Sequence, residues 1–586
     1  MTAQGWLQIA VYVAVLTALA VPLGTYMARV YQGRRVFLTP VVGPAERLIY
    51  RMLGVQPERQ SQDWKSYGKT VLVFSALFWV FLFAVLRLQG VLPFNPEGFG
   101  PAPWDVTFNT TSSFTTNTNW QYYGGETTLS YFSQMFGLAV QNFVSAGVGM
   151  AVLAAVIRGF ASREEKRLGN FWEDLTRSIL YILLPLSVVG ALILVSQGVV
   201  QTLSGYASLK TLTGFDQTLA LGPAASQIAI KQLGTNGGGF FNVNSSFPFE
   251  NPTQLSNFVE NLFILLIPAG AAIQFGRMVG SHRQGWALYA AMAVMMVAGL
   301  AISYGAEQNG SPAQKAAGIE TAASDGTTGG NMEGKDQRFG IADSALWATT
   351  TTDASNGSVN SALDSYTGLG GAVPLSNMMT GEVVWGGVGS GLYGMLMMVL
   401  LAVFIAGLMV GRTPEYLGKK VEAREVKLVL IATLVVPLLV LVATALAVTT
   451  PYGADSVYNP NPQGFSETLY AHTSQANNNG SAFAGYTGFL QPEAPGNVGS
   501  YGVTFADVLG GITMLIGRFV PLLAALAVAG SLAVKRVAPT GLGTMRTDTP
   551  TFAVLLIGVI LLVALLTFMP ALLLGPIVQS LTPRLF

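Results

Sequence analysis

Residues 234–239 read Gly-Thr-Asn-Gly-Gly-Gly, a short polar stretch enclosed by long apolar sequence. Similar segments recur along the chain, giving four candidate loops: Thr116-Asn117-Thr118, Thr235-Asn236-Gly237, Ser355-Asn356-Gly357 and Asn478-Asn479-Gly480. Their central asparagines lie 119 (236 − 117), 120 (356 − 236) and 123 (479 − 356) residues apart. One such triplet is ordinarily a turn, because Asn and Gly dominate turns. Four at a regular interval indicate one supersecondary unit used four times.

The composition places this repeat in a membrane. Hydrophobic residues make up 51% of the 586 residues and charged residues only 10%, whereas soluble domains carry roughly 25% charged residues. Ten apolar stretches have the length that crosses the hydrocarbon core of a bilayer. They lie near 6–29, 69–89, 132–157, 176–200, 254–276, 284–304, 390–411, 427–449, 503–534 and 551–575. The expected fold class is an all-α polytopic membrane protein embedded in the lipid bilayer.

Basic residues predict the orientation of these spans. Five connections hold 23 of the 31 Lys and Arg residues, namely 29–69, 158–177, 277–283, 412–427 and 535–546. The positive-inside rule puts these connections in the cytoplasm, so ten spans leave both termini outside. Ala18-Leu19-Ala20 resembles a cleavage site, but no Lys or Arg precedes the first apolar stretch. A retained first span therefore fits better than a cleaved signal peptide.

The repeat unit is predicted to be helix, pore helix, filter loop, helix, arranged with pseudo-four-fold symmetry. The segments before the loops, 104–115, 223–234, 341–354 and 464–477, are too short to span a bilayer. Irregular backbone at that depth must be enclosed by protein or line a wet cavity. The chain then divides into a first span with its cytoplasmic loop, four pore repeats and a last span: 1–68, 69–157, 176–279, 284–411, 425–534 and 551–586.

The loop chemistry favours a monovalent cation. Each loop supplies successive carbonyls, which can replace part of an ion's hydration shell. Glycine accepts positive φ and lets a carbonyl turn inward; it is third in three triplets, and Thr118 takes that place in the first. No triplet contains a carboxylate, the usual ligand of divalent ions. The loops therefore predict a filter for potassium or sodium, assisted by the negative C-terminal ends of the short helices.

Residues that flank the triplets carry further expectations. Four positions after the central asparagines stand Gln121, Phe240, Asn360 and Phe483. Both phenylalanines are expected to pack, whereas Gln121 either reaches the pore mouth or braces the first loop, and Gly238 also lies at the mouth. Asp353, just before the third triplet, either raises cation occupancy or bonds the local backbone at a helix end. We favour the helix-end interpretation, which short polar residues commonly adopt.

Longer strings around these loops resemble a known family. The matching stretches are 117–121, 234–242, 249–252, 477–485 and 411–420. They resemble the potassium-binding A subunits of the Kdp potassium-transporting ATPase, in the superfamily of potassium transporters. The resemblance implies a bacterial inner membrane and K⁺ as the transported ion. It also implies three partners: a P-type ATPase catalytic subunit, a C-type accessory subunit and a small single-span peptide. In that family the A subunit selects K⁺ from outside, and the ion passes along a tunnel toward the ATPase subunit.

The chain is not expected to bind nucleotide or nucleic acid. Gly68-Lys69-Thr70 looks like the end of a phosphate loop, but Asp63 stands where the leading glycine is needed. Two histidines, His282 and His472, are too few for a metal cluster, and the absence of cysteine excludes disulfides. Energy for transport must therefore come from a partner or an ion gradient. The alternative is a stand-alone potassium channel or symporter of the same superfamily.

Three further segments leave questions open. Residues 305–340, rich in Gly, Ala, Ser and Thr, are expected to form an exposed, mobile insertion outside. Glycines between 386 and 394 indicate either a gate or close helix packing in the seventh span. Arg412, with Lys419 and Lys420, either serves topology alone or contacts the ATPase partner and couples its cycle to ion delivery.

Overall fold

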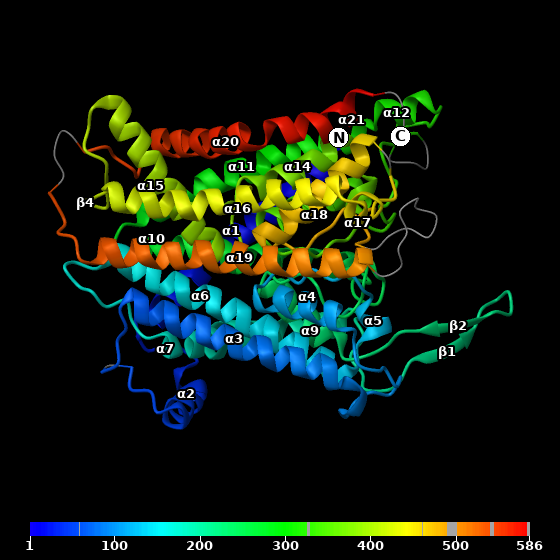
Figure 1. Ribbon diagram of the computed structural model, residues 1–586, viewed down its shortest axis with the longest axis horizontal. Helices are drawn as coiled ribbons and strands as arrows, with labels where there is room; N and C mark the ends of the chain where they lie inside the picture. The colour runs from blue at the N-terminus through cyan, green and yellow to red at the C-terminus, as the bar shows by residue number, and fades with distance from the viewer. Residues whose placement is uncertain (58, 325–328, 460, 489–500, 540–543, 583–586) are drawn as a thin grey trace.

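Ten long apolar helices run side by side through the molecule, with short helices and loops between them (Figure 1). The structure is a computed structural model that describes residues 1–57, 59–324, 329–459, 461–488, 501–539 and 544–582. Within these residues its regular elements are helices apart from two small antiparallel hairpins. Each expected span overlaps one of the ten candidate membrane helices, so the all-α polytopic fold class is confirmed.

Each repeat has a first helix, a short pore helix and a second helix. Repeat one has α3 (Trp64–Leu88), α4 (Trp104–Thr115), and η2 (Ser133–Leu138) with α6 (Ala139–Ala161). Repeat two has α7 (Phe171–Arg177), η3 (Ser178–Leu183) and α8 (Leu184–Ser196) as one span, then α9 (Ala224–Leu233) and α10 (Gln254–Met278). Repeat three has α11 (His282–Asn309), α13 (Gly340–Asp353), α14 (Gly368–Met379) and α15 (Ser390–Val410). Repeat four has α16 (Ala423–Thr449), α18 (Asn461–Asn477) and α19 (Tyr501–Ala533).

Two spans stand outside the repeats. Helix α1 (Ala3–Tyr31) packs closely along α10, where Gly24 lies against the carbonyl of Gly270. The last span is α20 (Pro550–Leu572), continued by η6 (Leu573–Ile577) and α21 (Val578–Leu581). Shorter elements in the connections are α2 (Thr39–Leu53), α5 (Gly125–Thr128), α12 (Pro312–Ala316), α17 (Pro451–Ala454), and the 3-10 turns η1 (Gln89–Val91), η4 (Asn244–Ser246) and η5 (Leu363–Ser365).

The second helix of each repeat lies inside the bundle. In the most apolar 18-residue stretch of the spans formed by α6 and α10, 89% of the residues are buried inside the protein. The corresponding stretches of the spans that begin with α3 and α16 are only 33% and 22% buried. The first helices therefore present their apolar side chains outward, as lipid-facing helices do, while the second helices enclose the pore helices. This division creates a protein-lined centre in which irregular backbone can exist at membrane depth.

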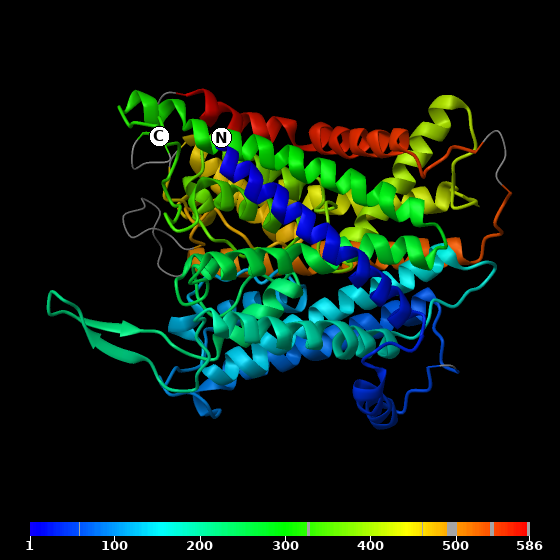
Figure 2. The same cartoon turned by 180° about the vertical axis from the view of Figure 1, so that it is seen from behind.

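The two ends of the bundle differ. The five basic connections share one end, near α2 and the hairpin of β3 (Glu415–Tyr416) and β4 (Lys419–Lys420). Both termini lie at the other end, from which the hairpin of β1 (Ala207–Lys210) and β2 (Asp216–Leu219) projects (Figure 2). Neither α2 nor the β1–β2 hairpin was expected from the sequence.

The expectation that residues 305–340 form an exposed insertion is wrong for part of this segment. Helix α11 extends into it, and Gln314, Asn331 and Lys335 are buried. The Lys335 ammonium lies 2.7 Å from a carboxylate oxygen of Glu307, both side chains being fully buried. Such a pair is kept only where the two charges satisfy each other, and it ties the segment to the end of α11.

Candidate functional site

The four polar loops all follow the C-terminal end of a pore helix and share one backbone course. Each loop holds two residues with positive φ, one residue apart: Asn117 (70°) and Asn119 (57°), Thr235 (47°) and Gly237 (87°), Ser355 (53°) and Gly357 (95°), Asn478 (63°) and Gly480 (97°). The φ values therefore run positive, negative, positive along each loop, which turns successive peptide units in opposite directions. Because the order occurs in every loop, it aligns the four loops residue by residue.

The alignment corrects the first triplet. In the first loop, the residues equivalent to the other three triplets are Asn117-Thr118-Asn119. The expected triplet Thr116-Asn117-Thr118 therefore starts one residue early. Thr116 instead ends α4, as Gly234 and Ala354 end α9 and α13. The expectation matched asparagine to asparagine, but the backbone places Thr118 at the centre and Asn119 at the glycine position. Asparagine is suited to that position because it tolerates the left-handed region.

Backbone hydrogen bonds support the same register. The amide of each central residue donates to the carbonyl five residues earlier, in the last turns of the pore helix: Thr118 to Ser113 (2.9 Å), Asn236 to Lys231 (2.8 Å), Asn356 to Thr351 (3.1 Å) and Asn479 to Ser474 (2.9 Å). In the part of the chain that the structure describes, no donor reaches the carbonyl oxygens of these four central residues. Buried carbonyls are normally paired, so four equivalent carbonyls that no donor reaches among the described residues are candidate ligands for a cation.

The loops are arranged as a ring in chain order. A Cβ added at Gly237 would clash with the carbonyl oxygen of Asn356 in loop three. In the same way, a Cβ at Gly357 would clash with Asn479 in loop four, and one at Gly480 with Thr118 in loop one. Gly238 closes the ring, since the Asn119 amide donates to its carbonyl at 3.3 Å and a Cβ there would clash with the Asn119 carbonyl. Glycine is thus needed where one loop packs on the next.

Polar side chains brace the ring from behind. The amide of Asn117 donates to the carbonyl of Thr235 (2.8 Å), and the hydroxyl of Ser355 to that of Asn478 (2.8 Å). The Asn478 amide donates to the Thr118 hydroxyl (2.9 Å). These bonds join loops one and two, three and four, and four and one. The candidate filter residues named from the sequence are therefore brought together, except that Thr116 caps α4 and Asn119 takes a place in the first loop.

Gln121 braces the first loop. Its amide nitrogen donates to the carbonyl of Gly239 at 3.2 Å, and its Oε1 accepts from the Gly239 amide at 2.9 Å. In the corrected register Tyr122, and not Gln121, is equivalent to Phe240 and Phe483. Phe240 is buried and Phe483 stacks on Tyr470 with centroids 4.1 Å apart, so the expectation that both pack is confirmed.

Asp353 ends α13 in a fully protein-enclosed position. Its Oδ2 has no hydrogen-bond partner among the described residues. The local hydrogen bond expected of a helix-end residue is not made by this oxygen.

The third repeat is interrupted directly behind the ring. Residues 380–389 separate α14 from α15, so the glycine-rich stretch breaks the helix. The Val388 amide donates to the hydroxyl of Thr235 (3.0 Å), and the Asn479 amide donates to the carboxylate of Glu382 (2.7 Å). The segment 380–389 therefore touches two filter loops at once.

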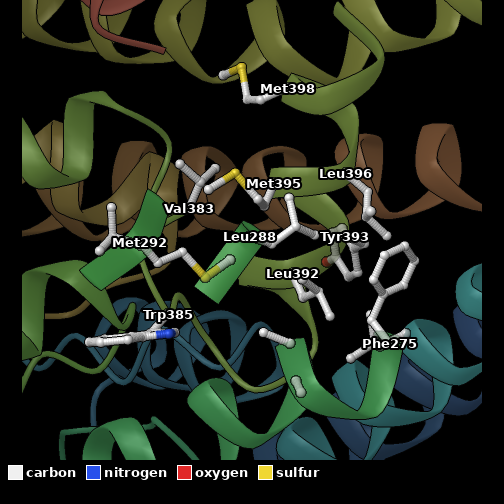
Figure 3. Close-up of a cluster of buried hydrophobic side chains, with 14 of the residues drawn as sticks. Phe275, Leu288, Met292, Val383, Trp385, Leu392, Tyr393, Met395, Leu396 and Met398 are labelled. Atoms are coloured by element: carbon white, nitrogen blue, oxygen red, sulfur yellow. The ribbon is translucent and has the colours of Figure 1, made fainter. Parts of the chain in front are cut away.

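Apolar packing holds this interrupting segment in place. Val383 and Trp385 lie in the same buried cluster as Leu288 and Met292 of α11 (Figure 3). The Trp385 ring lies 4.9 Å from the ring of Tyr289. Two close backbone contacts need glycine: a Cβ at Gly389 would clash with Gly149 of α6, and one at Gly386 with the Glu382 carbonyl. The close packing that the glycines indicate is therefore seen in this segment, whereas a gate there stays a prediction.

A cavity of about 110 Å³ adjoins the ring next to this segment. Its lining includes Ser355 and Asn478 of the filter loops, Glu382, Arg518 of α19 and Phe568 of α20. It therefore connects the filter to the contact region of repeats three and four with the last span.

Comparisons with known proteins agree with this architecture. Residues 10–581 match the family described as potassium-transporting ATPase A subunit. A potassium-transporting ATPase potassium-binding subunit of Sorangium cellulosum (strain So ce56) is 58% identical over 590 residues, covering 99% of both chains. One of Rhodospirillum centenum (strain ATCC 51521 / SW) is 56% identical over 582 residues, covering 99% of this chain and 98% of the relative. The crystal structure of the potassium transporter TrkH from Vibrio parahaemolyticus superposes with a TM-score of 0.52 at 14% identity, over 86% of this chain and 97% of that one, which shows a shared fold.

The ring predicts the effect of a side chain at Gly237. Gly237→Asp would force a Cβ into the Asn356 carbonyl at a positive φ and add a charge beside the ring. Overpacking of this kind costs about 1–3 kcal/mol, so we expect the half-saturating K⁺ concentration to rise about tenfold to hundredfold. The measurement is K⁺-stimulated ATP hydrolysis by the assembled complex.

Gly280→Asp is the matched control, because Gly280 has φ of 76° but nothing within 4 Å of an added Cβ. It should leave the K⁺ dependence as in the wild type. Wild-type K⁺ dependence in Gly237→Asp would refute the assignment of this loop to the filter.

Gln121 gives a second prediction. Gln121→Arg removes the acceptor of the Gly239 amide and places a cation near the ion, whereas Gln121→Met removes only the hydrogen bonds. A hydrogen bond contributes about 0.5–1.5 kcal/mol. We therefore expect about a threefold to tenfold rise in half-saturating K⁺ for Met and a larger rise for Arg. If only Arg has an effect, charge alone matters at this position, and bracing does not.

Proposed function

We propose, from the premise that this chain belongs to the potassium-transporting ATPase A-subunit family, that it is the potassium-binding subunit of an ATP-driven uptake complex. The chain takes K⁺ from outside through the four-loop filter. It does not catalyse ATP hydrolysis itself. The single observation that carries the proposal is the ring of four equivalent central carbonyls without donors, in a chain matched over nearly its whole length to this family.

The ring chemistry supports K⁺ as the ion. Neutral backbone carbonyls can replace the water that a monovalent cation loses, and the C-terminal ends of four helices add negative potential at the ring. Among the described residues, no group of three or more acidic or His side chains is placed to hold a metal ion. The triplets themselves offer only neutral oxygens, from backbone carbonyls and from hydroxyl and amide side chains, which suit a monovalent cation.

The complex we propose includes a P-type ATPase catalytic subunit, a C-type accessory subunit and a small single-span peptide. It lies in the bacterial inner membrane, with the basic end of the bundle in the cytoplasm and both termini in the periplasm. The ion leaves the ring through the adjoining cavity toward the ATPase subunit, and segment 380–389 gates that exit. Two features support this route: the cavity lining includes filter residues, and the segment contacts the filter.

The alternative is a stand-alone channel or symporter of the same superfamily. The likeness to TrkH concerns the fold alone, since identity is 14%. Co-expression with a P-type ATPase subunit, purification of the complex and an assay of K⁺-stimulated ATP hydrolysis separates the two. Purification of the chain without an ATPase, combined with K⁺ flux in vesicles, would refute the proposed function in favour of the alternative.

The cytoplasmic end of α15 is proposed as a contact with the ATPase subunit. Leu408, Met409 and Val410 are 63%, 81% and 66% exposed, and the exposed Arg412 follows them. In the next turn Lys419 is buried instead, donating to the carbonyl of Gly159 at 2.9 Å. An exposed apolar helix end beside a free basic side chain suits a protein partner.

We expect Arg412→Gln to leave half-saturating K⁺ unchanged while lowering K⁺-stimulated ATP hydrolysis or loosening the complex. Arg283→Gln, which removes one positive charge from another connection at the same end, is the control for topology. A stable Arg412→Gln complex with unchanged coupling would show that Arg412 serves orientation only.

A further inference from the structure

One pore helix carries a charged residue where the other three carry hydroxyls. The residues five positions before the loop centres, whose carbonyls accept the central amides, are Ser113, Lys231, Thr351 and Ser474. In loops three and four the hydroxyl at this position has a defined task. Thr351 Oγ1 accepts from the Gly357 amide and Ser474 Oγ from the Gly480 amide, both at 2.9 Å. Lysine cannot accept, so loop two must be held differently.

The backbone of Lys231 joins two filter loops. Its carbonyl accepts from the amides of Asn236 (2.8 Å) and Gly237 (3.2 Å) in loop two. It also accepts from the side-chain amide of Asn356 in loop three, at 3.3 Å. A displacement of this one carbonyl would therefore shift both loops.

The Lys231 side chain is fixed by the segment that returns from loop two. Both Lys231 and Glu250 are fully buried, and the ammonium forms an ion pair with Glu250 Oε1. The ammonium also donates to the Asn244 side chain at 3.4 Å. The Glu250 string, which belongs to the family resemblance, thus has a physical task behind the filter.

A second chain of hydrogen bonds leads from Glu250 and Glu260 to Asn356, the loop-three residue whose side-chain amide donates to the Lys231 carbonyl. Ser245 Oγ lies 2.6 Å from Glu260 Oε2 of α10 and 3.1 Å from Glu250 Oε1. The Gln232 amide donates to Glu260 Oε2 at 3.2 Å. The Ser358 hydroxyl then lies 2.9 Å from Gln232 Oε1 and 2.6 Å from Asn356 Oδ1. Both routes from the buried charges end on Asn356.

Burying the charged side chains of Lys231, Glu250 and Glu260 together costs free energy. One ammonium faces two carboxyl groups, all three residues being fully buried. One oxygen of each carboxyl, Glu250 Oε2 and Glu260 Oε1, has no partner in the part of the chain that the structure describes. A buried ion pair rarely stabilises a fold relative to apolar residues of the same volume. Its presence beside the filter is therefore better explained by the geometry it imposes than by stability.

We propose that Lys231, held by its ion pair with Glu250, is a positioning group that sets the spacing of filter loops two and three, and with it K⁺ affinity and discrimination against Na⁺. Selection in a carbonyl ring depends on how many carbonyls reach the ion and how they are held. The inference rests on the proposed function, because it concerns how the same filter selects its ion.

The test uses the whole purified complex with the variant Lys231→Met/Glu250→Gln, which removes both charges and nearly conserves volume. K⁺-stimulated ATP hydrolysis is measured over K⁺ concentration, with and without competing Na⁺. We expect half-saturating K⁺ to rise about tenfold, corresponding to about 1.4 kcal/mol. Discrimination against Na⁺ should fall, while the rate at saturating K⁺ stays near that of the wild type.

The chain offers a matched control pair in Lys335 and Glu307. Both side chains are likewise fully buried and ion-paired, but the Glu307 hydrogen bonds go to Asn331 and Thr367, away from the filter loops. Lys335→Met/Glu307→Gln should leave K⁺ affinity and Na⁺ discrimination unchanged. An equal shift in both double variants would overturn the proposal, because it would show a general effect of removing buried charge.

Ser358→Ala decides the question if the double variant fails to assemble. It breaks the link between Gln232 and Asn356 without leaving a charge unpaired. Unchanged K⁺ affinity and Na⁺ discrimination in this variant would overturn the proposal, and a selective loss of discrimination would support it. Absence of K⁺-stimulated hydrolysis in the wild-type complex is a separate result, which would refute the proposed function.

Discussion

The structure depends on keeping four buried carbonyls unpaired. A backbone carbonyl in a low-dielectric interior costs free energy unless something bonds it, and within a bilayer no water is available to do so. Here each central amide donates to a pore-helix carbonyl, and among the described residues no donor reaches the carbonyl of the same residue. The residues with positive φ on either side turn the successive peptide units in different directions. Ten spans of apolar helix serve to enclose this small polar ring.

The four repeats share one backbone conformation in their loops, but their side chains differ. All four loops share the φ pattern and the bond to the residue five positions back. Behind the ring, the hydroxyls of Thr351 and Ser474 accept from a glycine amide of their own loop, whereas Lys231 at the equivalent position forms an ion pair with Glu250. Selection of one ion requires equivalent carbonyls, so the backbone must be symmetric. Transfer of an ion toward one side requires surroundings that differ between the repeats, so the side chains behind the ring need not be symmetric.

Much of this arrangement could be predicted from local sequence. The first pore helix was expected at 104–115 and spans Trp104–Thr115, since helix length and the following polar triplet are local signals. The register of loop one was predicted wrongly because the two asparagines Asn117 and Asn236 were matched by residue type. The backbone instead aligns Thr118 with Asn236. The pairing of Lys231 with Glu250, and the contact of Glu382 with Asn479, could not be predicted. Such contacts are decided by the fold, and no periodic pattern in one sequence encodes them.

The interrupted third repeat follows from the same constraint. Between α14 and α15 the chain leaves its helix, so its backbone groups need other partners at membrane depth. The filter supplies one acceptor, the Thr235 hydroxyl for the Val388 amide, and the segment returns an acceptor, the Glu382 carboxylate for Asn479. The segment and the filter thus satisfy each other's polar groups. Movement of residues 380–389 would break bonds that hold loops two and four, so the position of this segment and the geometry of those loops are physically linked.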